Sequence, residues 1–172
     1  LETGRPPFDR ITARRAVALA TDRAEILAKA FTGQGSIARG MVSDTSPWFV
    51  DHSSPARDLD RARKQVEEYT KETGTPLTFR LLVAPGTTLE RVASLWRGQL
   101  QEAGIEMTVD IVDPATLSLA AAVGQYQAIL QVGFSASQPD AYEPLFRGIA
   151  AEQSAISSNV TRYINPLVTK AY

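Results

Sequence analysis

The sequence predicts an α/β domain, and three observations support this fold class. Apolar residues recur at helical spacing in some segments and form short runs or strict alternations in others. Gly, Pro and capping residues such as Asp stand between many of these segments. The predicted strands are separated by helices, which favours parallel pairing through crossover connections. A length of 172 residues suffices for one domain with its own core.

Two helices are predicted near the start of the chain. Residues 9–19 carry apolar side chains near helical spacing. A second helix begins at Thr21 or Asp22, either of which can accept hydrogen bonds from free amides, with Glu25 in the position of a capping partner. Its apolar face and the glycines that end it are Ile26, Leu27, Ala30 and Phe31, then Gly33 and Gly35.

Residues 34–56 are predicted to form a long irregular loop, because they contain five Ser, two Pro and two Gly. Loops of this length in a compact domain are usually functional or mobile. Trp48 and Phe49 lie within the loop, so we expect it to pack against another part of the molecule.

The next predicted elements are a helix, a strand and a helix. An amphipathic, charged pattern predicts a helix over residues 58–73, which Gly74-Thr75-Pro76 ends. An apolar run predicts a strand over 77–83. A further helix covers 87–103, with Gly104 as its cap.

Two strands flank a last predicted helix. Residues 105–112 alternate between apolar and polar side chains, so one face of this strand should be buried and the other wet. Asp113-Pro114 opens a helix that continues to residue 123, since Pro suits the first helical position. A strand is predicted over 126–133, and short helical pieces and loops follow Pro139.

Composition excludes several classes of function. The formal net charge is −1, so no basic excess indicates nucleic-acid binding. The absence of Cys excludes disulfides and thiolate chemistry. No run approaches the roughly 20 apolar residues that a membrane helix needs. The first residues lack the apolar region of a signal peptide, and we interpret the chain as a fragment of a longer protein.

A serine nucleophile is the first candidate chemistry. Residues 133–140, GFSASQPD, almost match the hydrolase elbow G-x-S-x-G around Ser135, but the final Gly is a Ser and Pro139 interrupts the required helix. The only His, His52, precedes Ser135, whereas an α/β hydrolase has its His after the Ser. A triad of this type is therefore excluded within the chain, and we expect no catalytic residue.

Metal and phosphate sites are also not predicted. With one His and no Cys, only carboxylates remain as ligands, and the Asp and Glu pairs at 58–60 and 67–68 lie on a solvated helix face. Gly33-Gln34-Gly35 lacks the third Gly, the Lys and the preceding strand of a phosphate loop. We expect neither a metal nor a cofactor. Loop aromatics are better candidates: Trp48 and Phe134 either line a ligand pocket or belong to the core.

Several segments resemble one family in the same order along the chain. Residues 5–23, RPPFDRITARRAVALATDR, resemble the opening of a lobe in the family 5 extracellular solute-binding proteins, which are peptide, dipeptide and nickel receptors of ABC importers. Further similar segments are LDRAR at 59–63, LQEAGI at 100–105, YQAILQVGF at 126–134 and NPLV at 165–168.

This resemblance implies a role in solute capture. It implies that residues 1–172 form one domain, a fragment of the large C-terminal lobe of a two-lobed protein, with a periplasmic-binding-protein-like, mostly parallel sheet flanked by helices. The ligand would lie between two closing lobes, and this chain would supply one wall. The partners would be a peptide or small-molecule ligand and the membrane subunits of an ABC importer, without nucleic acid or direct membrane insertion. The location would be periplasmic or at the cell surface, with a possible lipid anchor elsewhere in the parent.

The resemblance also assigns ligand-binding residues. The family's Trp is replaced by Phe134, and Ser137 stands where peptide-binding members carry an Asp that pairs with the peptide's free amine. Gln131 stands where some oligopeptide binders carry an Arg. We therefore expect a neutral, amine-blocked or sugar-like ligand, held by Phe134, Ser137 and Gln138, with Ser135 and Trp48 nearby. Asp140 takes the role of the missing Asp if the loop register shifts.

Two alternative functions stay open. The same lobe can serve as the ligand sensor of a cytoplasmic transcription regulator, which a helix-turn-helix in a preceding region would indicate. An α/β hydrolase would require a His after Ser135, which these residues do not contain and which a missing C-terminal part of the parent would have to supply.

Overall fold

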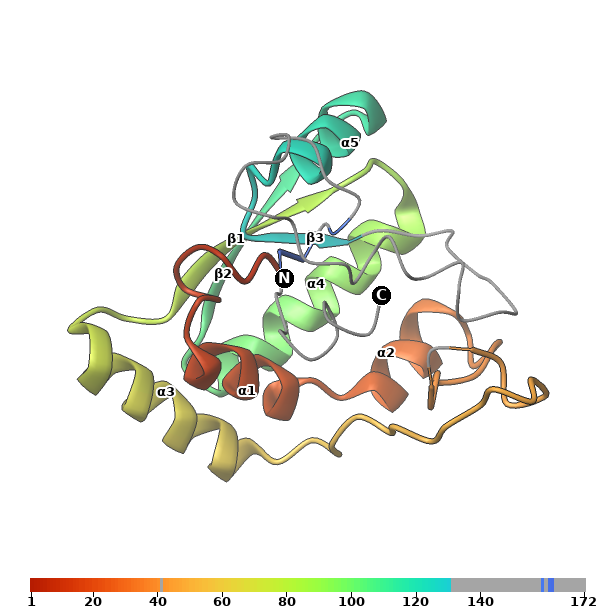
Figure 1. Cartoon of the computed structure of the whole chain (residues 1–172), viewed down its shortest axis with the longest axis horizontal. Coiled ribbons are helices and arrows are strands. Elements are labelled where there is room, and N and C mark those ends of the chain that lie inside the picture. Colours follow the sequence, from red (N-terminus) through yellow and green to blue (C-terminus); the bar gives the residue numbers. More distant parts are fainter. Residues whose placement is uncertain (41, 131–158, 160, 163–172) are drawn as a thin grey trace.

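The computed structural model describes residues 1–40, 42–130, 159, 161 and 162, and it is an α/β structure (Figure 1). A sheet with the strand order β2-β1-β3 lies among helices. The elements in chain order are α1 (Ile11–Ala20), α2 (Arg23–Ala30), α3 (Leu59–Thr73), β1 (Thr78–Val83), α4 (Thr87–Glu102), β2 (Glu106–Ile111), α5 (Pro114–Val123) and β3 (Ala128–Leu130).

The strands pair in parallel, as the alternation of helices and strands predicts. β1 is the central strand: Thr78 pairs with Glu106 of β2, and Val83 pairs with Ile111. On its other side Val83 pairs with Leu130 of β3. All three described strands therefore end at the same edge of the sheet.

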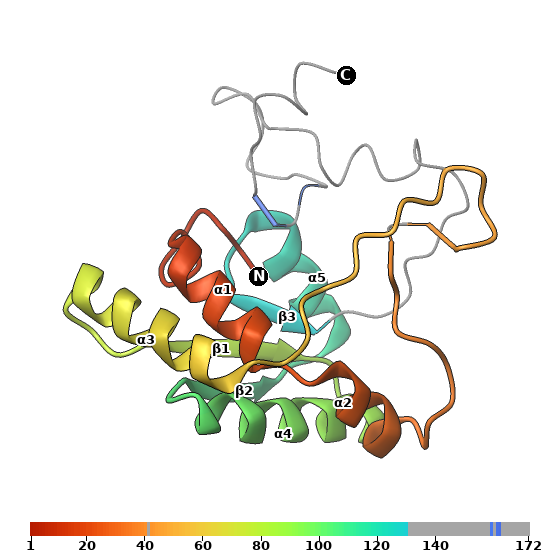
Figure 2. The same ribbon diagram turned by 90° about the horizontal axis from the view of Figure 1, so that it is seen from below.

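One face of the sheet carries the main core. The buried residues on this face are Phe79, Leu81 and Val83 of β1, together with Leu77 just before the strand. The Phe79 ring packs edge-on against Phe8 at 4.9 Å between centroids, and against Trp96 of α4 at 5.9 Å. Helix α4 and the segment that precedes α1 therefore cover the same face of the sheet. Helix α3 lies beside α1 (Figure 2).

The opposite face is divided between an apolar part and a polar part. Near the ends of the strands, Leu82 packs with Leu117 of α5 and with Tyr126, and all three are buried. Elsewhere this face carries exposed polar residues, such as Arg80 of β1, which pairs at 3.0 Å with Asp110, the next-to-last residue of β2. Helix α5 therefore covers only part of this face.

Capping residues fix the helix boundaries largely as predicted. Asp22, Asp58 and Asp113 each accept backbone N–H groups of the helix that follows them. At the end of α3, Gly74 adopts φ +71°, a left-handed conformation that other residues rarely take. The predicted ends of α1, α3, α4 and α5 are confirmed to within two residues.

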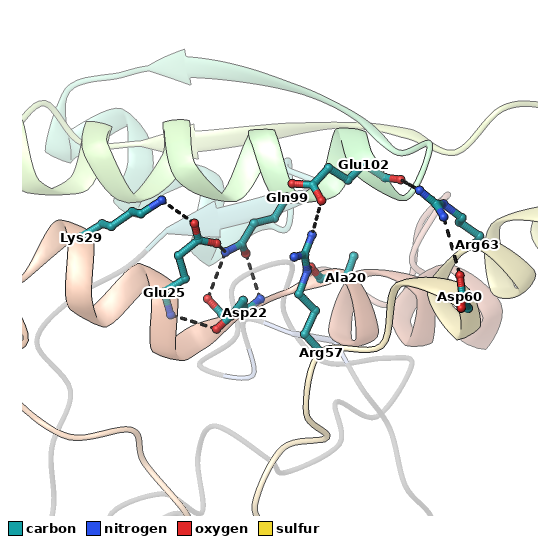
Figure 3. A network of polar contacts seen from close by, with 9 residues as sticks. All are labelled: Ala20, Asp22, Glu25, Lys29, Arg57, Asp60, Arg63, Gln99 and Glu102. Atoms are coloured by element: carbon teal, nitrogen blue, oxygen red, sulfur yellow. Dashed lines mark hydrogen bonds and ion pairs between the residues drawn. The ribbon is translucent and has the colours of Figure 1, made fainter.

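The capping partner of α2 is different from the prediction. Gln99 of α4, 3% exposed, accepts the Asp22 N–H at 2.9 Å, which is the bond expected from Glu25 in a capping box (Figure 3). The Gln99 amide also donates to the Asp22 carbonyl at 3.2 Å and to the Glu25 carboxylate at 2.7 Å. Glu25 bonds to Lys29 instead of closing the cap.

Two expectations about apolar residues are wrong. The alternation of apolar and polar residues in β2 predicts that Ile111 is buried, but its side chain is 55% exposed. Ile111 is the last residue of β2, which is an outer strand of the described sheet. Trp48 should help the 34–56 loop to pack down, but it is 63% exposed. Figure 2 shows this loop extending beyond α2, away from the sheet.

Candidate functional site

The edge at which the strands end is the candidate ligand site. In open α/β sheets, ligands bind outside the carboxyl ends of the strands. Val83, Ile111 and Leu130 end the described strands in register. The described connections that leave this edge are residues 84–86 after β1 and residues 112–113 after β2.

The connection after β1 is a tight glycine turn. Gly86 has φ +155° and precedes the first residue of α4. Its N–H donates to the Glu90 carboxylate at 3.1 Å, and the Glu90 N–H returns to the Gly86 carbonyl at 2.9 Å. An added Cβ at Gly86 would meet no atom within 4 Å, so conformation rather than space accounts for the glycine.

The connection after β2 contains a carboxylate that is committed to the fold. Asp113 accepts the N–H groups of Ala115 and Thr116, both at 3.0 Å, and the Thr116 hydroxyl donates to it as well. These hydrogen bonds lower the pKa of Asp113, and the bond from the Thr116 hydroxyl has the largest effect. Asp113 therefore holds the start of α5 and is a poor anchor for a ligand amine.

An exposed apolar residue lies at this edge that the sequence did not indicate. Ile111 ends β2 and remains 55% exposed. The periodicity of β2 places it among the inward residues, so no sequence signal separates it from Met107, which is 4% exposed. The exposed Ile111 side chain adds an apolar surface of the kind that lines ligand pockets.

Five of the predicted ligand residues lie outside the described residues. These are Gln131, Phe134, Ser135, Ser137 and Gln138, and Asp140 lies there too. Their roles remain predictions. By sequence, Gln131 directly follows Leu130, the last described residue of β3.

The sixth predicted residue, Trp48, lies in a loop with its own internal contacts. Arg39 pairs with Asp44 at 3.3 Å and with Asp51 at 3.2 Å, and its guanidinium lies 5.5 Å from the Phe49 ring centroid. The hydrogen bond from the Ser53 hydroxyl is the main cause of the lowered pKa of Asp51. Phe49, rather than Trp48, is the aromatic residue that packs within the loop, and a ligand role for Trp48 remains a prediction.

Neither a metal cluster nor a membrane span occurs in the part of the chain that the structure describes. No group of three or more His, Cys, Asp or Glu side chains is close enough there to hold a metal ion. Among the same residues, no helix has the length and apolar character to cross a membrane.

Solved structures of solute-binding proteins share this fold. The oligopeptide-binding protein AppA from Bacillus subtilis, in complex with a nonapeptide, is 23% identical with a TM-score of 0.81 over 98% of this chain and 36% of that one. OppA from Burkholderia pseudomallei is 21% identical with a TM-score of 0.82, over 99% of this chain and 34% of its own. NikA from Brucella suis, in complex with Fe(III)-EDTA, is 16% identical with a TM-score of 0.80, over 99% of this chain and 36% of its own.

The chain therefore spans about a third of the length of these proteins. Among curated proteins no sequence matches it. The family model of the bacterial extracellular solute-binding proteins, family 5 (middle region), matches residues 1–151, which include the three strands, the sheet edge and the predicted ligand segment. The chain belongs to the family 5 bacterial extracellular solute-binding proteins.

Proposed function

We propose that this chain is one wall of a ligand cleft, part of the C-terminal lobe of a protein that captures a solute and delivers it to an ABC importer. The family match over residues 1–151 carries this proposal. The sheet edge supports it, because the ends of parallel strands are the usual ligand position. The role is binding without catalysis, and the family description supports an extracytoplasmic location.

The structural neighbours bind dissimilar ligands, so their names do not identify this protein's ligand. One was solved with a nonapeptide and another with Fe(III)-EDTA. The ligand class must therefore come from this chain's own residues.

We propose a ligand without a free amine at the position of Ser137. Ser137 and Gln131 are neutral, whereas a buried ammonium group needs a paired carboxylate. Asp113, the described carboxylate in the connection that follows β2, is occupied by the amides of α5. Phe134 and Ile111 would give the apolar wall, and Ser137 and Gln138 would give hydrogen bonds.

The first test identifies the ligand that copurifies with the full-length protein. Mass spectrometry of small molecules released by denaturation should recover an unmodified neutral, sugar-like or amine-blocked compound. Recovery of a free-amine peptide would contradict the Ser137 argument but keep the capture function. Recovery of chemically altered ligand after incubation would contradict the non-enzymatic role.

A substitution tests the amine argument directly. Ser137→Asp should strengthen binding of a free-amine peptide by about tenfold, because a close carboxylate–ammonium pair contributes 1–3 kcal/mol or more. The same peptide with an acetylated amine is the matched ligand, and its affinity should not rise. Asp140→Asn is the matched variant: if it abolishes amine-dependent binding in the unsubstituted protein, Asp140 rather than position 137 holds the amine.

A further inference from the structure

A basic groove lies between α1 and α3, away from the strand ends. The two helices run side by side (Figure 2). A cavity of about 690 Å³ between them has three cations on its rim, Arg15 of α1 and Arg61 and Lys64 of α3. Its apolar floor is formed by Ala18 and Leu19, and the exposed Pro55 also lines the groove.

The walls of the groove are fixed to each other. The Asp58 N–H donates to the Leu19 carbonyl at 2.9 Å, joining the start of α3 to the end of α1. At the far end, the Thr12 hydroxyl donates to Glu72 at 3.0 Å. The Arg23 guanidinium donates to the Pro55 carbonyl at 3.3 Å and so fixes the position of Pro55, which lines the groove. A ligand therefore meets a preformed groove.

Two of the rim cations, Arg15 and Lys64, have no partner among the described residues, unlike neighbouring arginines. Figure 3 shows Arg57 bound to the Glu102 carboxylate at 2.8 Å and Arg63 bound to the Glu102 carbonyl at 3.1 Å. In contrast, no hydrogen bond or ion pair joins Arg15 or Lys64 to another described residue. Arg61 reaches only Asp58, at 3.9 Å, at the start of its own helix.

One carboxylate, Glu68, is among the described lining residues, and the Gln65 amide donates to it. The other side-chain atom of that amide, Gln65 Oε1, is buried without a hydrogen-bond partner. The lining thus has three cations against one engaged carboxylate, together with an acceptor that lacks a donor.

We propose that this groove binds an extended, acidic peptide segment of a partner protein. Arg61 and Lys64 lie one helical turn apart, about 5–6 Å, with Arg15 across the groove. Alternate side chains on one face of an extended chain are about 7 Å apart, so carboxylates at alternate positions can meet these cations. The methylene groups of these carboxylate side chains would rest on Ala18 and Leu19, and a backbone N–H can serve Gln65 Oε1.

Other anionic ligands fit less well. A single phosphate fills a small part of about 690 Å³ and gains nothing from the apolar floor. A flat anionic membrane surface does not enter a groove recessed between two helices. None of the described lining residues belongs to the strand ends, so this contact is separate from the proposed capture function.

The test is fluorescence anisotropy of the full-length protein with a labelled, terminally blocked peptide that alternates Glu and Leu. The combined variant Arg15→Gln, Arg61→Gln, Lys64→Gln should weaken binding at least about tenfold, because each charge-assisted contact contributes 1 kcal/mol or more. The matched control, Lys71→Gln, Arg91→Gln, Arg97→Gln, removes the same charge from exposed positions outside the groove and should change the affinity less than about twofold.

Four outcomes would overturn the proposal. These are the absence of peptide binding, equal weakening by both variants, displacement of the peptide by an equal concentration of inorganic phosphate, and equal binding of a peptide with Gln in place of Glu. Circular dichroism and thermal unfolding of both variants check that they fold, so lost binding is not lost structure. Ligand capture at the cleft is measured in parallel and should be unchanged.

Discussion

Gln99 joins two elements that are far apart in the sequence. It lies in α4, and its buried amide serves the backbone N–H and carbonyl of Asp22 at the start of α2 (Figure 3). At a helix start, a backbone N–H has no partner within the helix and requires one from elsewhere. Gln99 thus caps α2 and also fixes it to α4.

Replacing Gln99 should therefore destabilise the protein. Gln99→Ala leaves the Asp22 N–H without its acceptor and creates a small cavity, so the free energy of unfolding should fall by about 2 kcal/mol or more. Urea unfolding followed by circular dichroism measures this change. Gln101→Ala, at an exposed position of the same helix, should change it by less than about 0.5 kcal/mol. Equal effects of the two variants would show that the Gln99 bonds contribute nothing specific.

Glu25 should make stability depend on acid pH. Its hydrogen bond with Lys29, and next that with Gln99, lower the pKa of Glu25 in the folded protein. A lowered folded pKa gives stability that is present above the unfolded pKa, about 4.3, and is lost as the pH falls through the folded pKa.

The Glu25→Gln variant should therefore lose less stability than the unsubstituted protein between about pH 5 and pH 3. Urea unfolding across this range gives the comparison. Glu67→Gln, at an exposed position without a partner among the described residues, is the control and should leave the pH dependence unchanged. An unchanged pH dependence in Glu25→Gln would contradict the role of the Lys29 and Gln99 bonds.

At the scale of single residues, the sequence predicts contacts between residues close in the chain and misses contacts between distant ones. The caps Asp22, Asp58 and Asp113 bond to amides two or three residues away, so their spacing alone identifies them. Gln99 reaches Asp22 across 77 positions, and no local pattern contains that information. A polar residue at an inward helix position, between Trp96 and Leu100, is the only signal that points to a buried partner.

At the scale of elements, periodicity predicts helices and strands well where burial is uniform along them. α3 and α4 each have one buried face, and their predicted ranges are confirmed. β2 departs from this at Ile111, because burial ends before the strand does. Periodicity shows which side of a strand a residue takes, but only the packing of other elements decides whether that side is covered.

The 34–56 loop shows the same limit. Its composition correctly predicts irregular structure. The internal arrangement depends on Arg39, which faces two carboxylates and the Phe49 ring at once. Gly40 permits this arrangement, since an added Cβ would lie 2.7 Å from the Val50 carbonyl oxygen. Trp48 and Phe49 are adjacent aromatics, and the sequence could not tell which of them packs.

For the whole molecule, the sequence predicts the fold class and family, and the position of the candidate site follows from the parallel topology. Once the three described strands are parallel, their ends meet at one edge, and Gln131 is next in the sequence after Leu130. The chemistry of the cleft is harder to predict, because the chain spans about a third of its structural neighbours and the proposed ligand contacts with the other lobe lie beyond it.

The division of the apolar residues into two clusters should appear as two levels of local stability. The main core joins α1, α3 and α4 to one sheet face, whereas α5 is held through a small cluster around Leu82, Leu117 and Tyr126. Segments with few buried apolar contacts open more readily than the global fold unfolds. Amides of α5 should therefore exchange with solvent deuterium at a lower opening free energy than those of β1. A low concentration of urea should change the opening free energies of the β1 amides more strongly than those of α5. Native-state hydrogen exchange measures both, and the same opening free energy for α5 and β1 would mean that the two clusters unfold as one unit.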